Sequence, residues 1–269
     1  MTEGLVSGIR FRVLDLYEQA LMQLPALREE GDREALHRYR VNLRKCRCLL
    51  ELFIEELWQT PACALSLSFA AQIKVSNLVR DLDVFVAQLK PGPLRDYVEQ
   101  LRQFRLANLH DQLHRLEREQ LLCQSVLALK WTLNQTQLAD ATVDISEQLR
   151  LQIIAQTERA LSTGKSKHWH RVRILVKKQR YLIDLCLPQG RSGLAQEWQD
   201  RLGAFNDSCC QLTILNDIEP GSAELKTELL SQKSDLQLQK AQTLDVLVKL
   251  GRRELKKKNA FGHLVEINR

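Results

Sequence analysis

Glycine and proline are scarce in this chain, and that scarcity limits the folds open to it. The 269 residues include only 11 Gly and 6 Pro. An all-β sandwich or barrel needs a turn about every 8–12 residues, and so few turn formers do not supply them. Leu, Gln, Arg, Lys, Glu and Ala are common instead, and these residues favour helix. The sequence therefore predicts a mostly helical protein with long elements and short loops.

Length and composition are those of an ordinary globular protein. The chain is 44% hydrophobic and 27% charged, and its 269 residues suffice for one large domain or two small ones. No run approaches the ~18 apolar residues of a membrane span. The N-terminal MTEGLVSGIRF also lacks the apolar region of a secretory signal. We therefore expect a cytoplasmic protein with no membrane partner.

Apolar periodicity, and the breaks between periodic segments, predict two sets of four helices. The first set covers about 5–24, 33–58, 61–90 and 94–134. The second covers about 145–161, 166–187, 193–217 and 223–258, after a polar connector at 136–142. Asp32 and Ser222 are expected N-caps. Because short connections make neighbouring helices antiparallel, the predicted fold is all-α, with one four-helix bundle in residues 1–135 and another in 136–269.

The second helix of each set carries the same basic motif. The pattern H-x-x-R-[VI]-x-x-[RK]-K-x-R occurs twice, at a constant offset of 133 residues. Such a match within one chain indicates an internal repeat. The residues shared by the two copies are His37, Arg40, Arg44, Lys45 and Arg47 in the first and His170, Arg173, Lys177, Lys178 and Arg180 in the second.

The spacing places most of these cations on one face of each helix. At about 100° per residue, positions i, i+3, i+7 and i+10 fall within an arc of roughly 80°. Like charges so arranged repel one another, and residues 165–180 contain no Asp or Glu. An anionic partner explains the pattern better than helix stability does. A solvated basic face, cations paired with acids of a neighbouring helix, and histidines with purely structural roles stay open as alternatives.

The third helix of each set repeats more weakly. Arg80 and Asp81 correspond to Asn206 and Asp207. We expect Arg80, Asp81 and Asp207 to orient the basic side chains, since a carboxylate can hold an arginine in one rotamer. Asp81 and Asp83 lie two residues apart and point to different sides of a helix. A metal site at that pair is therefore disfavoured.

The two basic motifs, together with RDLDV at 80–84 and LGAFND at 202–207, resemble those of the CHAD family, the conserved histidine α-helical domain. The resemblance covers about residues 5–260. It implies two four-helix bundles related by pseudo-twofold symmetry, with a basic groove at their junction that binds inorganic polyphosphate. By the same resemblance, the ten motif residues are the polyphosphate ligands. Polyphosphate granules are the implied location, and proteins that metabolise polyphosphate are implied partners.

Catalysis has little support in the sequence. There is no Walker loop, GxSxG or HExxH motif. The seven Cys form neither a CxxC pair nor a disulfide framework, so we expect reduced thiols in a helical core. His110 and His114 have a spacing that permits a metal, but no further ligand is evident nearby. We predict a non-catalytic binding module without a cofactor or a metal.

Three other functions stay open. Basic helices also suit nucleic acids, but only Tyr39, Trp169 and Tyr181 could stack on bases, so we expect nucleic acid to bind only as a non-specific competitor. An enzyme acting on polyphosphate is a second alternative. The third is a scaffold for acidic proteins that uses the basic run 252–258. For the leading hypothesis, affinity should fall steeply with salt and, through His37 and His170, rise modestly toward about pH 6.

Overall fold

The computed structural model describes residues 4–54, 62–117, 135–186, 195–257 and 260–262. Within these ranges every regular element is a helix, so the predicted all-α class is confirmed. The chain divides into two compact units, Met1–Ala141 and Thr142–Arg269, called unit 1 and unit 2 below. We had predicted the division after residue 135. The observed one falls inside a helix, α8 (Gln135–Thr163).

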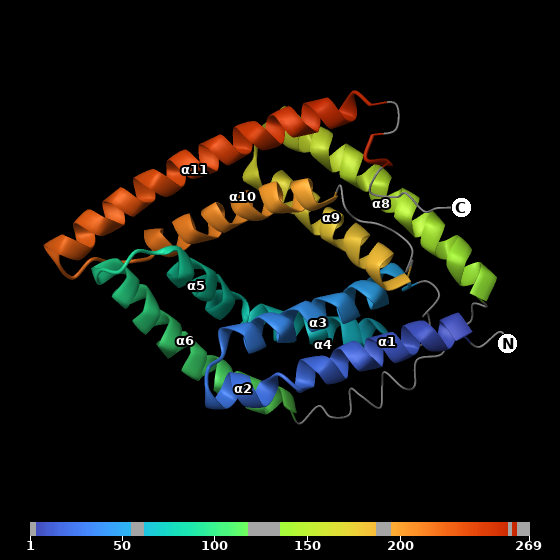
Figure 1. Ribbon diagram of the computed structural model, residues 1–269, viewed down its shortest axis with the longest axis horizontal. Helices are drawn as coiled ribbons and strands as arrows, with labels where there is room; N and C mark the ends of the chain where they lie inside the picture. Colours follow the sequence, from blue (N-terminus) through green and yellow to red (C-terminus); the bar gives the residue numbers. More distant parts are fainter. Residues whose placement is uncertain (1–3, 55–61, 118–134, 187–194, 258–259, 263–269) are drawn as a thin grey trace. The chain divides into compact units, whose positions relative to one another are not determined.

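Unit 1 is built around a central helix that carries the first basic motif. Its helices are α1 (Gly4–Leu21), α2 (Leu24–Glu29), α3 (Arg33–Leu52), α4 (Ala62–Val75), α5 (Asn77–Gln88) and α6 (Pro93–Glu117) (Figure 1). Helix α3 packs against α1, α2, α4 and α5. Its inner face consists of apolar side chains such as Leu36, Leu43 and Leu49, all fully buried. Because α3 packs against four other helices, only the part of its surface outside these contacts is left to bind a ligand.

The helices of unit 1 differ from the prediction in two places. The expected helix at 61–90 is two helices, α4 and α5, which meet at a 42° bend beside Ser76. The segment before Asp32, predicted as a loop, contains the short helix α2, which has a proline in its first turn. Proline is tolerated there because its missing N–H is one that the helix leaves unpaired. The break at Ser76 matters for function, because it exposes backbone acceptors that a basic side chain uses.

The turn between α2 and α3 requires glycine. Gly31 has a φ of +62°, and a Cβ at this position would lie 2.6 Å from Leu106 Cδ2. Arg102 of α6 donates from Nη2 to the Gly31 carbonyl at 2.8 Å. The next residue, Asp32, caps α3 by accepting from the Glu34 backbone N–H, as predicted. The start of the motif helix is thus fixed by local and tertiary contacts together.

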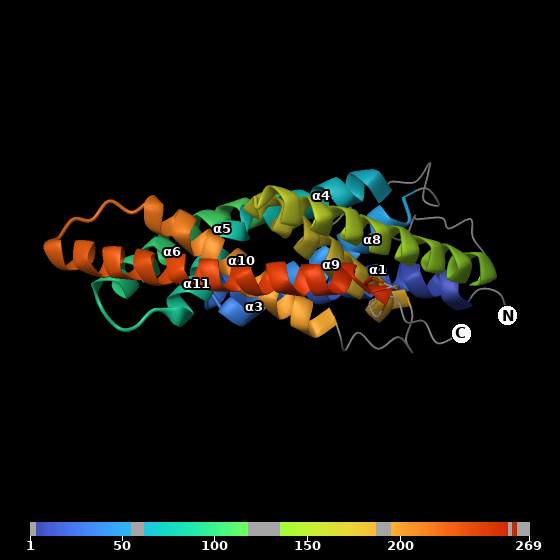
Figure 2. The same ribbon diagram turned by 90° about the horizontal axis from the view of Figure 1, so that it is seen from above.

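In unit 2 the central helix is α10 (Ala195–Asn216), not the motif helix. The unit also comprises α8, α9 (Ser166–Cys186) and α11 (Ala223–Leu255), with α10 packed against both α9 and α11. Figure 2 shows α11 unbroken over its 33 residues. The Ser222 side chain caps it by accepting from Leu225 N–H, as predicted. The polar connector that we predicted at 136–142 is wrong, because this segment is the first part of α8.

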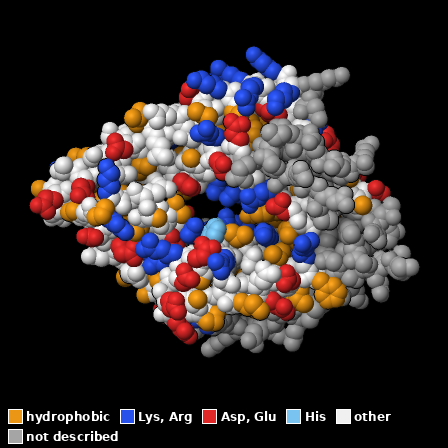
Figure 3. Space-filling model, viewed as in Figure 1, with side chains coloured by type: hydrophobic (Ala, Val, Ile, Leu, Met, Phe, Trp, Pro, Cys, Tyr) orange, Lys and Arg blue, Asp and Glu red, His pale blue; other side chains and the backbone are white. Residues whose placement is uncertain are grey.

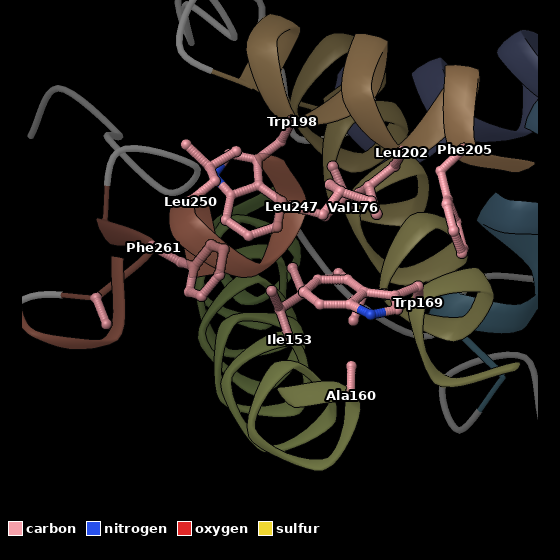
Figure 4. Close-up of a cluster of buried hydrophobic side chains, with 12 residues drawn as sticks. Ile153, Ala160, Trp169, Val176, Trp198, Leu202, Phe205, Leu247, Leu250 and Phe261 are labelled. Carbon is pink, nitrogen blue, oxygen red and sulfur yellow. The ribbon is translucent and has the colours of Figure 1, made fainter. Parts of the chain in front are cut away.

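Aromatic side chains fill the interior of unit 2. Trp169 of α9 lies beside Ile153 and Ala160 of α8, and Trp198 of α10 packs against Phe261 with ring centroids 5.0 Å apart (Figure 4). Phe261 is held by its backbone N–H, which donates to the buried Glu254 carboxylate at 2.9 Å. These contacts position α9 from its buried side.

Membrane spans and cysteines complete the description. In the described part of the chain, no single helix is long and apolar enough to cross a membrane, although α4 and α5 together meet the length and composition criteria as a bent pair. Six of the cysteines lie in the described residues, and none of the six forms a disulfide; Cys46, Cys48 and Cys186 are buried as predicted, whereas Cys63 is exposed and Cys209 and Cys210 are half-buried. Cys123 lies outside the described residues.

Candidate functional site

Arg40, at the second position of the first motif, is buried. Only 5% of the residue is exposed. Its Nη1 donates to the Ile73 carbonyl at 2.8 Å and to Ser76 Oγ at 2.6 Å, and its Nη2 donates to Asn77 Oδ1 at 2.7 Å. These acceptors lie at the break between α4 and α5. We expected Arg40 on an exposed stripe, but the structure makes it a positioning residue that ties α3 to this break.

The charge of Arg40 is not neutralised by its hydrogen-bond partners. All three acceptors are uncharged groups, and burial together with the nearby Arg44 lowers the pKa of Arg40 to about 10. The carboxylates of Asp81 and Asp83 oppose this effect from α5. The guanidinium is therefore still a cation near neutral pH, and it contributes a positive field to this side of α3. Asp81 acts on Arg40 through its charge, while its predicted role in holding an arginine in one rotamer stays a prediction.

His37 lies among cations at the beginning of the same face. It is half-buried, and its Nδ1 has no hydrogen-bond partner among the described residues. Burial lowers the pKa of His37 below 6.5, and the positive charge of Arg80 lowers it further. Arg80 therefore acts on the histidine by repulsion. In the free protein, His37 is held neutral at pH values where an ordinary histidine begins to protonate.

The remaining cations of the α3 motif are half-buried: Arg44, Lys45 and Arg47. Arg44 donates from Nε to the backbone carbonyl of Arg40, one turn earlier, at 3.3 Å. Arg47 forms an ion pair with Glu51, with Nε 2.7 Å from Oε1. Such a pair, four residues apart on one helix and still partly in solvent, contributes only a few tenths of a kcal/mol, so an incoming anion can displace it.

In unit 2 the motif helix α9 carries six Lys or Arg and a single acidic residue, Asp184. His170 is exposed, and its Nδ1 is 2.8 Å from Asn206 Oδ1 on α10. An amide oxygen only accepts hydrogen bonds, so Nδ1 donates and Nε2 is left facing away from this partner. Asn206, which we had not selected, orients the histidine. Asp207 is half-buried and lies 3.5 Å from the Asn206 amide nitrogen.

Arg173 corresponds to Arg40, but its surroundings differ. It is half-buried, and among the described residues its buried Nε has no hydrogen-bond partner. Two further cations of the α9 motif, Lys177 and Lys178, follow Arg173 in the sequence and are also half-buried. The Nε of Arg40 is likewise buried without a hydrogen-bond partner among the described residues, so the difference lies in the bonds that Arg40 donates from Nη1 and Nη2 to the break between α4 and α5.

Arg180, the last cation of the motif, repeats the arrangement of Arg47. Its Nε lies 3.7 Å from Asp184 Oδ2, and its Nη1 donates to Gln199 of α10. Asp184 follows Glu51 at the same offset of 133 residues as the motif itself. The acidic residue one turn after each motif is therefore part of the repeat. Its i+4 spacing was the sequence signal for it.

Aromatic residues near both motifs face the protein interior. Tyr39 is 1% exposed and donates to Gln72 Oε1 at 2.8 Å, while Trp169 is fully buried and Tyr181 is 5% exposed. None of the three presents a ring face for a base to stack on. The basic faces of α3 and α9 thus offer cations without stacking platforms.

The other acids that we considered for a metal are engaged elsewhere. Asp83 is 2% exposed and accepts from Arg102 Nε at 2.5 Å. His110 Nε2 is 3.0 Å from the Leu27 carbonyl, and nothing is described for the side chain of His114. Within the described residues, no group of three or more His, Cys, Asp or Glu side chains is placed to hold a metal ion.

A third basic region lies at the end of α11. Figure 3 shows Lys and Arg side chains gathered there, at the top of the view. Lys257 pairs with the buried Glu254 at 2.6 Å, and Arg253 Nη2 lies 3.6 Å from Glu197 Oε2. Cations at a helix C-terminus also complement its dipole. Lys258 lies outside the described residues.

Comparison with known proteins identifies the family and supports the fold. The family model described as the CHAD domain matches residues 12–216, which include both motif helices. The chain belongs to the CHAD domain family. The crystal structure of the CHAD domain from the plant Ricinus communis is similar in fold, with a TM-score of 0.60 and 19% sequence identity over 97% of this chain and 92% of that one. No curated protein matches the chain. Helix α11 follows the part that the CHAD family model covers.

Proposed function

We propose that this CHAD domain protein binds inorganic polyphosphate through the basic faces of α3 and α9, without cleaving it. The observation that carries the proposal is the second motif, where residues 165–180 hold no acid and Arg173 lacks, among the described residues, the hydrogen bonds that tie Arg40 to the neighbouring helices. Polyphosphate has one negative charge per internal phosphate and no base edges. A row of cations at helical spacing therefore suffices to bind it.

The two motifs differ in how they would hold phosphate. Arg44 of α3 corresponds to Lys177 of α9. A guanidinium can donate two parallel hydrogen bonds to one phosphate, while an ammonium acts as a mobile point charge. We propose that one long chain contacts both motifs, as the predicted groove requires. Linking two contacts in this way raises affinity well above that of either alone.

The buried aromatics favour polyphosphate over single-stranded nucleic acid. Proteins that bind single strands without sequence preference stack bases on exposed rings. Tyr39, Trp169 and Tyr181 are 1%, 0% and 5% exposed, so they do not serve this purpose. Location on polyphosphate granules, and association with proteins that metabolise polyphosphate, follow from the proposed binding and are part of the same proposal.

A salt titration tests the binding mechanism. Affinity for long-chain polyphosphate should be measured from about 50 mM to about 200 mM salt, where contact with several phosphates predicts a loss of roughly 10³-fold or more. The double variant Arg173→Gln plus Lys177→Gln should have a smaller slope than wild type. The exposed Lys249→Gln, whose partner is Asp245 of its own helix, is the matched control and should keep the wild-type slope. A flat salt response in wild type would contradict the proposal.

Two further measurements separate the alternatives. Competition between polyphosphate and duplex DNA at equal phosphate concentration should favour polyphosphate, and a preference for DNA would support the nucleic-acid alternative. Incubation with polyphosphate and a divalent metal, followed by analysis of chain length, should leave the chains unchanged. Shortened chains would show that the protein is an enzyme.

A further inference from the structure

Unit 2 contains an open pocket beside the first turn of α9. Its volume is about 240 Å³. Leu202, Phe205 and Cys209 of α10 form an apolar floor, and Lys167, His170 and Asn206 provide the polar side of the lining. Leu202 and Phe205 are 1% and 2% exposed, so the floor is the outer edge of the hydrophobic core. Polyphosphate does not use an apolar floor, and the proposed function leaves this feature unexplained.

The apolar floor excludes a bare inorganic anion as the best ligand. A phosphate group placed against Leu202 and Phe205 would lose hydration without gaining hydrogen bonds there. An apolar or aromatic group gains free energy in the same place through the hydrophobic effect. The volume is below the ~300–1,000 Å³ of pockets for drug-sized ligands. A group of one or two rings therefore matches the space.

The polar side of the pocket matches an anionic group on such a ligand. Lys167 is exposed and carries a full positive charge. His170 Nδ1 donates to Asn206 Oδ1 at 2.8 Å, which leaves Nε2 for a ligand; Nε2 donates to a phosphate oxygen when the ring is protonated and accepts from a P–OH group when the ring is neutral. The thiol of Cys209 is a weak anchor for an anion, because burial raises its pKa and so keeps it protonated. Charge complementarity thus comes from Lys167, and His170 adds a hydrogen bond.

We propose that this pocket is a second ligand site, which binds a small organic phosphate through its ring system on the α10 floor and its phosphate on Lys167 and His170. The site lies within unit 2 and does not depend on polyphosphate binding. His170 is nevertheless also the first residue of the α9 motif. A ligand in the pocket therefore competes with polyphosphate for that histidine, and it provides a means of regulating the motif.

Binding of 1-naphthyl phosphate to the full chain tests the proposal. Calorimetry should show this compound binding at least about tenfold more tightly than either inorganic phosphate or 1-naphthol, because only it satisfies both sides of the pocket. Lys167→Gln should weaken it about tenfold. The matched control is Lys165→Gln, which removes an equal charge from an exposed position outside the pocket lining and should change affinity by less than about twofold.

A second variant and a labelling experiment locate the ligand. Thr213→Tyr adds bulk at an exposed position of the pocket lining and should abolish binding while leaving the unfolding transition unchanged. Alkylation of Cys210, followed by mass spectrometry, should slow when naphthyl phosphate is present but not with inorganic phosphate. Naphthyl phosphate binding no tighter than inorganic phosphate, or equal losses in Lys165→Gln and Lys167→Gln, would overturn the proposal.

The same experiment separates this proposal from polyphosphate binding. Titration of wild type with long-chain polyphosphate, with and without saturating naphthyl phosphate, should show weaker polyphosphate binding when the pocket is filled. If naphthyl phosphate binds and polyphosphate does not, the proposed function fails and the pocket stands. If polyphosphate binds and naphthyl phosphate does not, the pocket proposal alone is refuted.

Discussion

Helices α3 and α9 carry the same motif, yet the arginine at its second position lies in different surroundings. Arg40 is 5% exposed and donates three hydrogen bonds to the break between α4 and α5. Arg173 is half-buried and lacks these hydrogen bonds, although among the described residues the buried Nε is without a partner in both arginines. The same residue type at the same motif position thus ties helices together in unit 1, and we propose that in unit 2 it binds the ligand.

The beginnings of the two helices differ in charge. Asp32 and Glu34 lie at the start of α3, where Glu34 pairs with Arg38 at 3.0 Å. The corresponding residues at the start of α9 are Lys165 and Lys167. The histidines differ too, since His37 experiences the charge of Arg80 while His170 is bonded to Asn206. We therefore expect the motif of unit 2 to bind an anion more tightly than that of unit 1.

The largest expected effect is on stability, from Arg40. Arg40→Ala removes its three hydrogen bonds and leaves the buried Ser76 hydroxyl and the Ile73 carbonyl without that donor. We expect the free energy of unfolding to fall by about 3 kcal/mol. Urea unfolding measures it. The corresponding Arg173→Ala should lower the free energy of unfolding by less than about 1 kcal/mol. Equal losses in the two variants would mean that both arginines stabilise the fold to the same extent.

The next largest effect is on the affinity for polyphosphate, and here the larger change is expected from Arg173. Arg173→Gln should weaken polyphosphate binding about tenfold, because a charge-assisted contact is lost. Titration with polyphosphate of defined length, at one salt concentration, measures the change. Lys249→Gln serves again as the control for net charge. An Arg173→Gln protein that binds as tightly as wild type would remove Arg173 from the site.

A charge exchange at matched positions gives a smaller change. Glu34→Lys gives α3 the charge of α9 at this position and should strengthen binding about threefold, whereas Lys167→Glu should weaken it by more than that. Polyphosphate titrations of the two variants measure both changes. If both variants weaken binding, the charges at the beginnings of α3 and α9 do not account for the expected difference in polyphosphate binding between the two units.

The smallest effect concerns pH and His37. Its pKa lies below 6.5, so the unfolded chain binds a proton in a range where the folded protein does not. The stability contributed by neutral His37 is thus present above pH 6.5 and declines as pH falls toward the folded pKa. His37→Gln should remove that decline in urea unfolding between about pH 5 and pH 7.5. A wild-type protein more stable at pH 5 than at pH 7 through His37 would contradict it.

The affinity for polyphosphate should also depend on the protonation of His37. A bound polyanion favours imidazolium, so affinity rises as pH falls, and the lowered pKa moves the His37 part of this rise to more acidic values than for an ordinary histidine. Arg80→Gln removes the repelling charge and should shift the rise toward neutral pH. An unchanged pH profile in Arg80→Gln would show that Arg80 does not control His37.

Much of this molecule could be predicted from its sequence by itself. Helical periodicity and the scarcity of turn formers gave the all-α class, and Asp32 and Ser222 were correctly predicted as N-caps because capping depends on local hydrogen bonds. The constant offset of 133 residues identified the repeated motif, since it needs no knowledge of packing. The acids Glu51 and Asp184, one turn after each motif, were within reach of the same comparison.

The tertiary structure decided what each motif residue does. The break at Ser76, between α4 and α5, supplies the acceptors that draw Arg40 inward, and neither the break nor its position relative to α3 is encoded in the motif. Asn206 holds His170 through a contact between α9 and α10, and the two residues are 36 positions apart in the sequence. Burial and pairing depend on neighbours that only folding brings together. A repeated sequence can therefore fix which residues are cationic without fixing which of them are free to bind.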